Sequence, residues 1–405
     1  MKRFLRLTSL ILSLSLLAGC SLSNRILHHS DSSFTVQSAD QQTTSTLEFQ
    51  APLFTDAAPV LLWGRQQLTP HAQNTYDRMS ESIACRRETP LAVDADTGEI
   101  QRILTALRID HPEYFWFDGE ASFVSTTLAG VNIRTECTFT YTMELSEIQA
   151  AHQQVQQYTE ACLSSEELSE AQTDYEKILG VYRYIINHTD YILSEADQSI
   201  VSVMSRQQGT CAGYARTFQY LMNQLGIPCT LALGEGASGE SHGWNMVQCD
   251  GHWYQIDVTW GDPVGADDMP GDSIQYTYCL LTDQEIYRDH TLVCDLPMPE
   301  CTDTTYNYFV QSGRQFDIWD PASYESAMLQ ATEQGETWFS VRFSNLDAYH
   351  SAVSALFEQG LIWDIMTQSG AASSTQTRVT YTQNDLFYEI SVQLDGNVTS
   401  GRNET

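Results

Sequence analysis

The sequence predicts an α+β fold, and three observations in the central part of the chain carry that prediction. Apolar side chains recur at helical spacing over residues 211–225, and Gly226 follows as a helix stop signal. Two strand-like runs, residues 242–248 and 253–259, flank Asp250-Gly251, which is a strong signal for a two-residue hairpin turn. A further helical pattern covers residues 175–186 and should pack beside the first helix.

The amino terminus has the pattern of a secretory signal. Basic residues precede an apolar run over residues 7–17, and this run is shorter than the roughly 20 residues that span a bilayer. The next residues, Leu17-Ala18-Gly19-Cys20, resemble the bacterial lipoprotein box, which implies cleavage before Cys20 and attachment of lipid to its thiol. We therefore expect a protein anchored to the cell membrane and facing its extracytoplasmic side.

The chain is long enough for more than one hydrophobic core, with 405 residues of which 42% are hydrophobic. The residues that follow Cys20 are rich in Ser, Asp, Gln and Thr, a composition typical of a flexible tether. The predicted division is 1–19 for the signal peptide, 20–49 for the lipidated cysteine and tether, 50–164 for an N-terminal α+β accessory region, 165–300 for a catalytic domain, and 301–405 for a C-terminal α+β accessory module.

The two accessory parts have recognisable patterns of their own. The N-terminal region has a helical pattern over residues 100–107 and strand-like runs at 123–127 and 137–143. The C-terminal part, from Tyr306, follows a β-α-β-α-β-β order that suggests a small sandwich. Its elements are a first strand, helices at 324–334 and 348–359, a strand at 338–343, and a hairpin around Gln383-Asn384-Asp385, with Trp338, Phe339, Phe343, Phe357 and Trp363 at core-like spacings.

Cys211 would be the first residue of the predicted central helix. Only the thiolate is a good nucleophile, and the partial positive charge of a helix N-terminus stabilises a thiolate there. The free N–H groups of the first turn could also donate to an oxyanion. A lone cysteine is more often a small buried hydrophobe. Its place at a helix start is what makes Cys211 a candidate nucleophile.

The predicted hairpin supplies a candidate base and a carboxylate. If Asp250-Gly251 is the turn, Trp244 lies opposite Asp257, and His242 lies opposite Thr259, two pairs further out. Diagonal neighbours on one face of a hairpin are roughly 7 to 8 Å apart at the backbone, which is within side-chain reach. Asp257 could then hold one imidazole nitrogen of His242 while the other faces Cys211.

These stretches resemble the transglutaminase-like superfamily, the papain-related group in which a cysteine at a helix start meets a histidine and an aspartate on adjacent antiparallel strands. The matching stretches are Cys211–Ala215, Leu225–Pro228, His242–Asn245 and Trp253–Pro263, within about residues 175–263.

By this resemblance Cys211 is the nucleophile, His242 the base and Asp257 the residue that orients it. The upstream stretch Ile109–Trp116 and the downstream Arg288-Asp289-His290 resemble the flanks of bacterial multidomain members. One departure is Gly243, where alanine is usual between the histidine and the tryptophan, and we expect it to matter little.

The same part of the sequence contains side chains that could have a structural or a metal-binding role. Trp244, Trp253 and Trp260 are expected to form core or cleft walls, since large aromatic side chains mainly contribute buried area. Zinc is disfavoured, because the sequence has no Cys-x-x-Cys pair and no His-Glu-x-x-His helix.

Eight further cysteines could form disulfides in an exported protein or remain buried free thiols, with Cys294 and Cys301 a plausible local pair. They are Cys85, Cys137, Cys162, Cys229, Cys249, Cys279, Cys294 and Cys301.

Composition excludes some partners. The chain has 52 acidic against 20 basic residues and a net charge of −32, so nucleic acid is not expected as a partner. There is no Walker loop and no Gly-x-Gly-x-x-Gly after a strand, so no nucleotide cofactor is expected, and the proposed chemistry needs none. The charge excess alone identifies no substrate, because such an excess is usually a solvated face.

The sequence thus predicts a cysteine acyl-transfer enzyme acting on a protein or peptide, with cell-wall material among the candidates. A thioester on Cys211 would be resolved by water, as in a protease or amidase, or by a primary amine, as in a transglutaminase. Sequence does not choose between these outcomes, although we lean to hydrolysis. The alternatives are a non-catalytic surface binding module that keeps a papain-like cleft, and an assembly scaffold that engages a partner through its C-terminal module.

Overall fold

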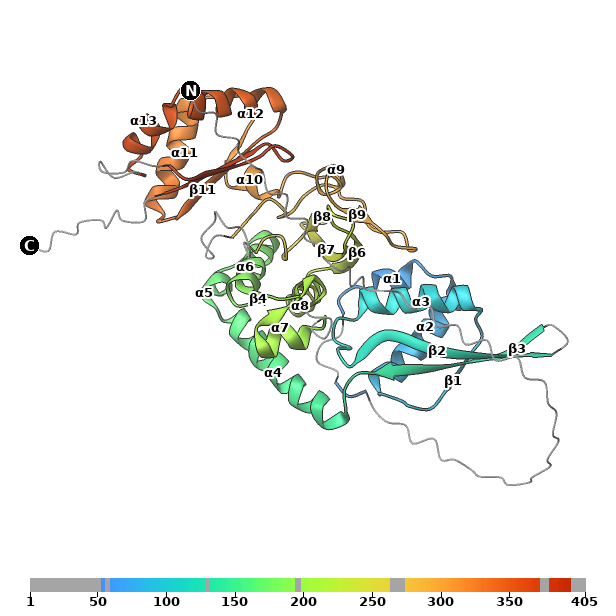
Figure 1. Ribbon diagram of the computed structural model, residues 1–405. Helices are drawn as coiled ribbons and strands as arrows, with labels where there is room; N and C mark the ends of the chain where they lie inside the picture. The colour runs from blue at the N-terminus through green and yellow to red at the C-terminus, as the bar shows by residue number, and fades with distance from the viewer. Residues whose placement is uncertain are drawn as a thin grey trace, which may run out of the picture.

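The computed structural model describes residues 52–54, 59–128, 131–193, 198–262, 274–371 and 379–394. The expected signal peptide, Cys20 and the expected tether lie outside these ranges, as does Pro263. Along the chain the described elements form an N-terminal part, a central part and a C-terminal part that follow one another in space (Figure 1).

The central part combines helices with a four-stranded antiparallel sheet in the order β8-β7-β6-β9. The helices α6 and α7 both pack against α8. The helices are α5 (Glu166–Ser169), α6 (Asp174–Asn187), α7 (Ile200–Arg206), α8 (Cys211–Gln224) and α9 (Asp283–Ile286). The strands are β4 (Asp190–Tyr191), β5 (Gln208–Gly209), β6 (Cys229–Glu235), β7 (Ser241–Cys249), β8 (His252–Ile256) and β9 (Thr291–Leu292).

Helix α8 forms where the apolar spacing predicted it. Thr210, in extended conformation, is the N-cap residue, and Cys211 is the first helical residue. Tyr214, Phe218 and Leu221 lie on its buried face, each fully or almost fully removed from solvent. The chain leaves the helix at Gly226, whose φ of 76° is a left-handed conformation that glycine adopts without steric cost.

The central hairpin has the predicted register. Asn245 pairs with Ile256 and Cys249 with His252. Asp250 and Gly251 both have positive φ, at 48° and 83°, as a two-residue type I′ turn requires. The prediction that the second strand continues to Thr259 is wrong, because β8 ends at Ile256. The next backbone N–H, that of Asp257, donates instead to the carbonyl of Tyr278.

The N-terminal part packs helices on one face of a three-stranded sheet in the order β1-β3-β2 (Figure 1). The predicted helix and both predicted strands are present. Close packing of α1 on α3 depends on Gly64, where a Cβ atom would lie 2.7 Å from the backbone of Ala106. The elements are α1 (Trp63–Gln66), α2 (Pro70–Ala84), β1 (Leu91–Val93), α3 (Thr97–Asp110), β2 (Phe117–Leu128) and β3 (Val131–Tyr141).

The helix α4 (Leu145–Leu163) belongs to the central hydrophobic core. Its buried side chains Ile148, Val155 and Cys162 are in the same core cluster as Ile178 of α6 and Phe218 of α8. This core therefore crosses the position between residues 164 and 165 where the sequence suggested a domain boundary.

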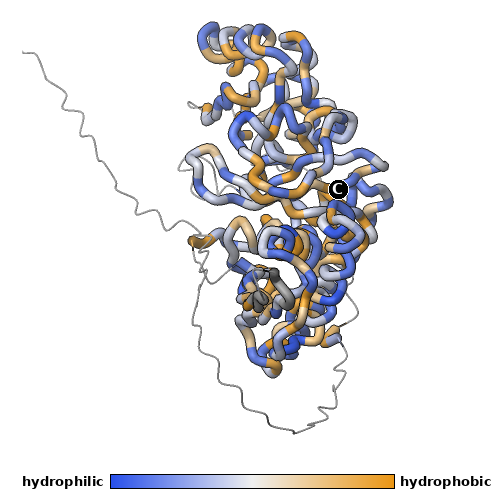
Figure 2. Tube along the Cα trace, turned by 90° about the vertical axis from the view of Figure 1, so that its right-hand side faces the viewer, coloured by the Kyte–Doolittle hydropathy of each residue, from blue (hydrophilic) through white to orange (hydrophobic). Residues whose placement is uncertain are grey.

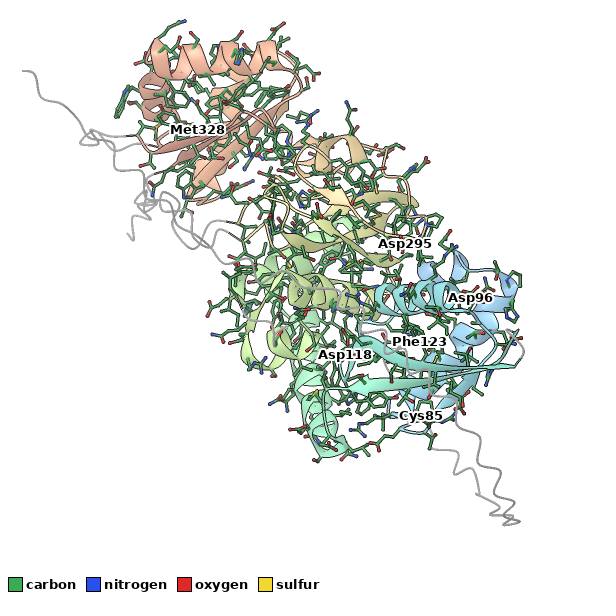
Figure 3. The ribbon with its side chains drawn as sticks, turned by 45° about the vertical axis from the view of Figure 1, so that its right-hand side comes forward. Cys85, Asp96, Asp118, Phe123, Asp295 and Met328 are labelled. Atoms are coloured by element: carbon green, nitrogen blue, oxygen red, sulfur yellow. The ribbon has the colours of Figure 1, made fainter. Side chains whose placement is uncertain are left out.

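The C-terminal part is a two-layer module, with three helices over a four-stranded sheet in the order β10-β11-β13-β12. Met328 of α11 is fully buried between these layers (Figure 3). The elements are α10 (Tyr308–Gln311), β10 (Gln315–Phe316), α11 (Pro321–Glu333), β11 (Trp338–Phe343), α12 (Leu346–Val353) with a π-helical turn (Ser354–Glu358), α13 (Leu361–Gln368), β12 (Tyr381–Asn384) and β13 (Glu389–Gln393).

Two expectations for this module are wrong. Residues 361–368 form α13, which the predicted element order lacked. Trp363, expected in the core, is 39% exposed, because the buried face of α13 is made by Ile362, Ile365 and Met366.

All nine described cysteines are free thiols, so the suggested pair of Cys294 with Cys301 is not formed. Burial raises the pKa of the eight described thiols other than Cys211. Within the described ranges, none of the helices combines the length and apolar character that crossing a bilayer requires. Apolar and polar residues alternate along the chain trace instead (Figure 2).

Arg342 joins the C-terminal module to the central part. Its Nε donates to Oε1 of Glu389 at 2.8 Å within the module. Its other nitrogens reach the carbonyl oxygen of Thr277 at 2.7 Å and the carboxylate of Glu285 at 3.2 Å in the central part. Arg342 and Glu389 are both almost fully buried, at 3% and 4% exposed.

We predict that Arg342→Met lowers the free energy of unfolding by about 3 to 5 kcal/mol, because it leaves Glu389 buried without its cation. Urea unfolding followed by tryptophan fluorescence measures the loss. Arg65→Met is the control, since Arg65 and Asp77 form an ion pair that is largely exposed and should contribute about 1 kcal/mol or less. Equal effects of the two substitutions would contradict the assigned role of Arg342.

Candidate active site

The structure brings Cys211, His242 and Asp257 together. Cys211 is at the N-terminus of α8 and partly exposed, whereas His242, near the start of β7, is 6% exposed. Asp257 follows the last residue of β8 and is fully buried. Nε2 of His242 lies 2.7 Å from Oδ2 of Asp257, and the Cys211 thiol is close enough to His242 to help raise the pKa of that imidazole. The imidazole thus connects the thiol to the carboxylate.

The early end of β8 is what fixes the Asp257 carboxylate. Because the strand has ended, the chain folds back, and Oδ1 of Asp257 accepts from the backbone N–H groups of Thr259 at 2.9 Å and Trp260 at 3.3 Å. The other oxygen, Oδ2, is left for the imidazole of His242. A carboxylate held by backbone donors on one oxygen cannot rotate freely, so it orients the imidazole ring.

The electrostatics of the pair favour an imidazolium. Burial works against a charge on His242, but the charge of Asp257 and its hydrogen bond outweigh burial, so the pKa of His242 is raised. Burial likewise works against a charged Asp257, yet His242 and His290 hold the pKa of that carboxyl well below its usual range. A neighbouring imidazolium is the partner that stabilises a cysteine thiolate.

His290 is part of the site and was not among the predicted site residues. Its Nε2 lies 3.2 Å from Oδ2 of Asp257, and its Nδ1 lies 2.7 Å from Oδ1 of Asp289. Both ring nitrogens therefore meet carboxylate oxygens, an arrangement that suits a doubly protonated imidazolium. Consistently, the pKa of His290 is raised by these two carboxylates against the effect of burial. The one sequence signal was the Arg288-Asp289-His290 stretch.

Aromatic rings enclose the imidazoles. The ring of Trp260 lies 5.4 Å from that of His242 and 4.3 Å from that of His290. Trp244 is completely buried and lies 6.0 Å from His242. Trp253, by contrast, packs edge-on against Trp63 of the N-terminal part. The expectation that the tryptophans form core or walls is confirmed: Trp244 and Trp253 belong to or pack on one core cluster, and Trp260 lies beside the two imidazoles.

His242, Asp257 and His290 also form a group of metal-ligand side chains, with their donor atoms within 4.8 Å of one another. The geometry favours hydrogen bonding over metal binding here. A histidine nitrogen must be unprotonated to ligate a metal. Nε2 of both rings is instead directed at the same carboxylate oxygen, at hydrogen-bond distances.

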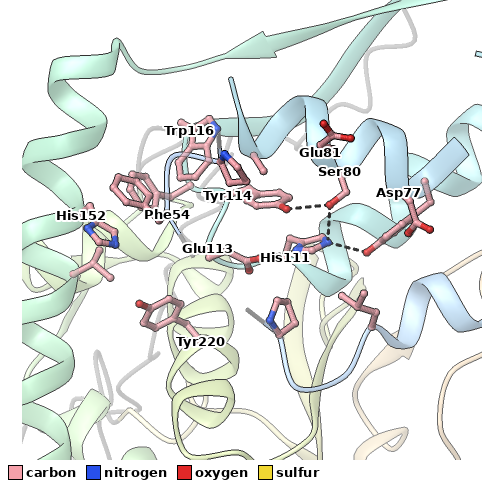
Figure 4. Close-up of a pocket in the computed structure, with 17 residues that line it drawn as sticks. Phe54, Asp77, Ser80, Glu81, His111, Glu113, Tyr114, Trp116, His152 and Tyr220 are labelled. Atoms are coloured by element: carbon pink, nitrogen blue, oxygen red, sulfur yellow. Dashed lines mark hydrogen bonds and ion pairs between the residues drawn. The ribbon is translucent and has the colours of Figure 1, made fainter. Parts of the chain in front are cut away.

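A separate cavity of about 470 Å³ lies away from the thiol, between α2, α4 and the far part of α8 (Figure 4). His111 and Glu113 of the Ile109–Trp116 stretch line it, joined by a hydrogen bond of 2.6 Å. Ser80 Oγ is 3.0 Å from the hydroxyl of Tyr114 and 3.4 Å from Nε2 of His111 (Figure 4). This stretch therefore contributes to the contact between the N-terminal and central parts.

A helix-borne thiol with a histidine and a buried aspartate from an antiparallel hairpin defines a papain-like thiol site. Residues 163–258 match the family model described as the transglutaminase-like superfamily, so this part of the chain is a transglutaminase-like domain. The match ends one residue after Asp257 and includes all three predicted site residues.

The curated relatives are similar to a limited part of this chain. Kyphoscoliosis peptidase of Homo sapiens is 29% identical over an alignment of 116 residues that covers 24% of this chain and 18% of that protein. The Mus musculus protein of the same name is 28% identical over an equally long stretch with the same shares. A solved structure described as a TGase covers 45% of this chain and 54% of its own, with 18% identity and a TM-score of 0.27. The chain thus spans under a fifth of the length of the curated relatives.

We predict that Asp257→Asn lowers the pKa of His242. The substitution removes the charge that raises this pKa and leaves the burial that opposes it, so His242 should titrate at or below its ordinary value of about 6.5. Histidine-selective NMR titration measures the change, with His242→Gln and His290→Gln used to assign the signals. A His242 signal that still titrates above pH 8 in Asp257→Asn would contradict the pairing.

Proposed function

We propose that the chain is a cysteine acyl-transfer enzyme of the peptidase type, with Cys211 as nucleophile, His242 as general base and acid, and Asp257 as the orienting carboxylate. The observation that supports this most directly is that His242 lies between Cys211, the first residue of α8, and the buried Asp257, to which His242 is hydrogen-bonded. Each link matches what thiol catalysis requires: an activated sulfur, a proton carrier and a fixed ring orientation.

In the first half-reaction the Cys211 sulfur attacks the carbonyl carbon of the substrate amide, and the carbonyl π electrons move onto oxygen. N–H groups of the first turn of α8, which have no partner within the helix, are placed to stabilise that oxyanion. The C–N bond then breaks as His242 gives its proton to the leaving amine. The product is a thioester on Cys211 and a neutral His242.

In the second half-reaction His242 takes a proton from water as the water oxygen attacks the thioester carbonyl. The C–S bond breaks, a carboxylic acid leaves, and the thiolate and imidazolium are restored. A primary amine in place of water would give a new amide, which is transglutamination. We favour water, because the curated relatives that are similar to this chain are named peptidases. Transfer to an amine remains the second candidate, from the family to which the domain belongs.

We further propose that the enzyme acts outside the cytoplasm on protein or peptide, held to a membrane by lipid on Cys20. The support is the sequence alone: the short apolar run and the Leu17-Ala18-Gly19-Cys20 stretch. Metabolic labelling with a fatty-acid analogue tests it, since Cys20→Ser should abolish incorporation and release the protein from membranes.

We predict that iodoacetamide alkylates Cys211 rapidly at pH 6 to 7, and that His242→Ala slows this reaction at least ten-fold. The reason is that the imidazolium partner, whose pKa is raised, stabilises the thiolate in this range. Peptide mass spectrometry of the modified chain measures the rate at Cys211, and the buried Cys279 serves as an internal unreactive reference.

An alkylation rate that is indifferent to His242 would refute the catalytic assignment and favour a non-catalytic binding module. If the thiol is activated, glutamine-containing peptides offered with and without a fluorescent primary amine separate the two outcomes. Hydrolysis releases a free acid or a shortened peptide, whereas transfer attaches the fluorophore.

A further inference from the structure

A second cavity, of about 480 Å³, opens beside the first turns of α8. Ala212, the neighbour of Cys211, and Gly243, the neighbour of His242, both line it. Its remaining walls come from β6, α7 and the residues just before it, the end of α3, the connection from α3 to the start of β2, and the residues after β3. It therefore lies where the N-terminal part meets the central part. Asp118, which also lines it, marks this junction in Figure 3.

The charge of this cavity is opposite to that of the chain. Three arginines, Arg108, Arg206 and Arg216, line it, and Asp118 is the one acidic residue among its described lining residues. The whole chain has only 20 basic residues against 52 acidic ones. From this composition, acidic residues should outnumber basic ones around a cavity, and the opposite is found here.

Arg216 differs from Arg108 and Arg206, each of which has an interaction within the chain. It is partly buried on α8, about 7.5 Å further along the helix axis than Cys211. No hydrogen bond or ion pair from the described part of the chain reaches its guanidinium. Burial, together with the charge of Arg108, lowers the pKa of Arg216 to about 10. A bound anion would relieve both effects.

The backbone leaves room for this arrangement at two glycines. The aliphatic part of Arg108 lies across Gly119, where φ is 86° and a Cβ atom would come within 2.6 Å of the arginine side chain. At Gly243 a Cβ atom would meet no atom closer than 3.7 Å, so the absent methyl group simply enlarges the cavity beside the site. An alanine would fit at this position without a clash, in agreement with the expectation that the departure matters little.

We propose that this cavity, the arginine pocket, is a substrate subsite that binds a carboxylate next to the reacting carbonyl of the acyl donor. This deepens the proposed function and rests on it. The guanidinium groups of Arg216 and Arg108 bind the carboxylate, and apolar walls from Phe117, Leu231 and Leu233 receive the rest of the residue. The carboxylate comes from an acidic side chain or from a free C-terminus of the peptide.

The test compares two alkylating reagents of nearly equal size at Cys211, the anion iodoacetate and the neutral iodoacetamide. We expect Arg216→Gln to lower the ratio of the iodoacetate rate to the iodoacetamide rate by about three- to ten-fold, and Asp118→Asn to raise it, because each changes one charge near the sulfur. Arg102→Gln is the matched control: it removes an exposed charge from the same helix as Arg108, outside the pocket, and should leave the ratio unchanged.

The ratio cancels effects on the thiol itself, since both reagents need the same thiolate. A ratio in Arg216→Gln equal to that of the wild type would overturn the subsite, whatever the iodoacetamide rate. Loss of the His242 dependence of that rate would instead overturn the proposed function. The two failures are therefore distinguishable.

Protection of Cys211 from iodoacetamide by peptides then identifies the source of the carboxylate. Three matched peptides are compared: one with an acidic side chain and an amidated end, one with a free C-terminus and no acidic side chain, and one that is neutral. Stronger protection by the peptide with the acidic side chain indicates an endopeptidase-like preference for acidic residues. Stronger protection by the peptide with the free C-terminus indicates a carboxypeptidase-like preference. Equal protection by all three would overturn the proposal.

Discussion

The site depends on one buried carboxylate. Asp257 has no exposure to solvent, yet it carries charge because four donors surround it: two backbone N–H groups and two imidazoles. An unpaired buried carboxylate would become protonated. The His242 ring would then lose the hydrogen bond that orients it and the negative charge that raises its pKa. Three features keep Asp257 ionised. They are the early end of β8, the backbone N–H groups of Thr259 and Trp260, and the contact with His290.

The helix α8 connects this site to the rest of the molecule. Its first residue carries the thiol, and its second turn carries Arg216 into the arginine pocket. Tyr220, further along, lines the separate cavity against the N-terminal part. The N-terminal part therefore does not merely flank the catalytic domain. It supplies Arg108 and Asp118 to the arginine pocket, which is also lined by Ala212 and Gly243, the sequence neighbours of Cys211 and His242.

Local patterns in the sequence predicted what local physics decides. The apolar spacing placed α8 with Cys211 first, and Asp250-Gly251 fixed the hairpin register that brings His242 and Asp257 together. The end of β8 at Ile256 was missed, because it results from a hydrogen bond to Tyr278, more than twenty residues away. His290 and the arginine pocket were missed for the same reason: they join segments from distant parts of the chain, which periodicity cannot relate. Trp363 was misplaced because an aromatic residue on a short helix can face either way.

The free thiols give the molecule an uneven sensitivity to oxidants. Eight described cysteines have raised pKa values and seven of these are buried, so they rarely present a thiolate to a peroxide. Cys211, partly exposed and paired with an imidazolium, is the sulfur that would be converted to a sulfenic acid. Mild oxidation would thus block the Cys211 thiol and leave the fold intact, and a thiol reductant could restore the free thiol.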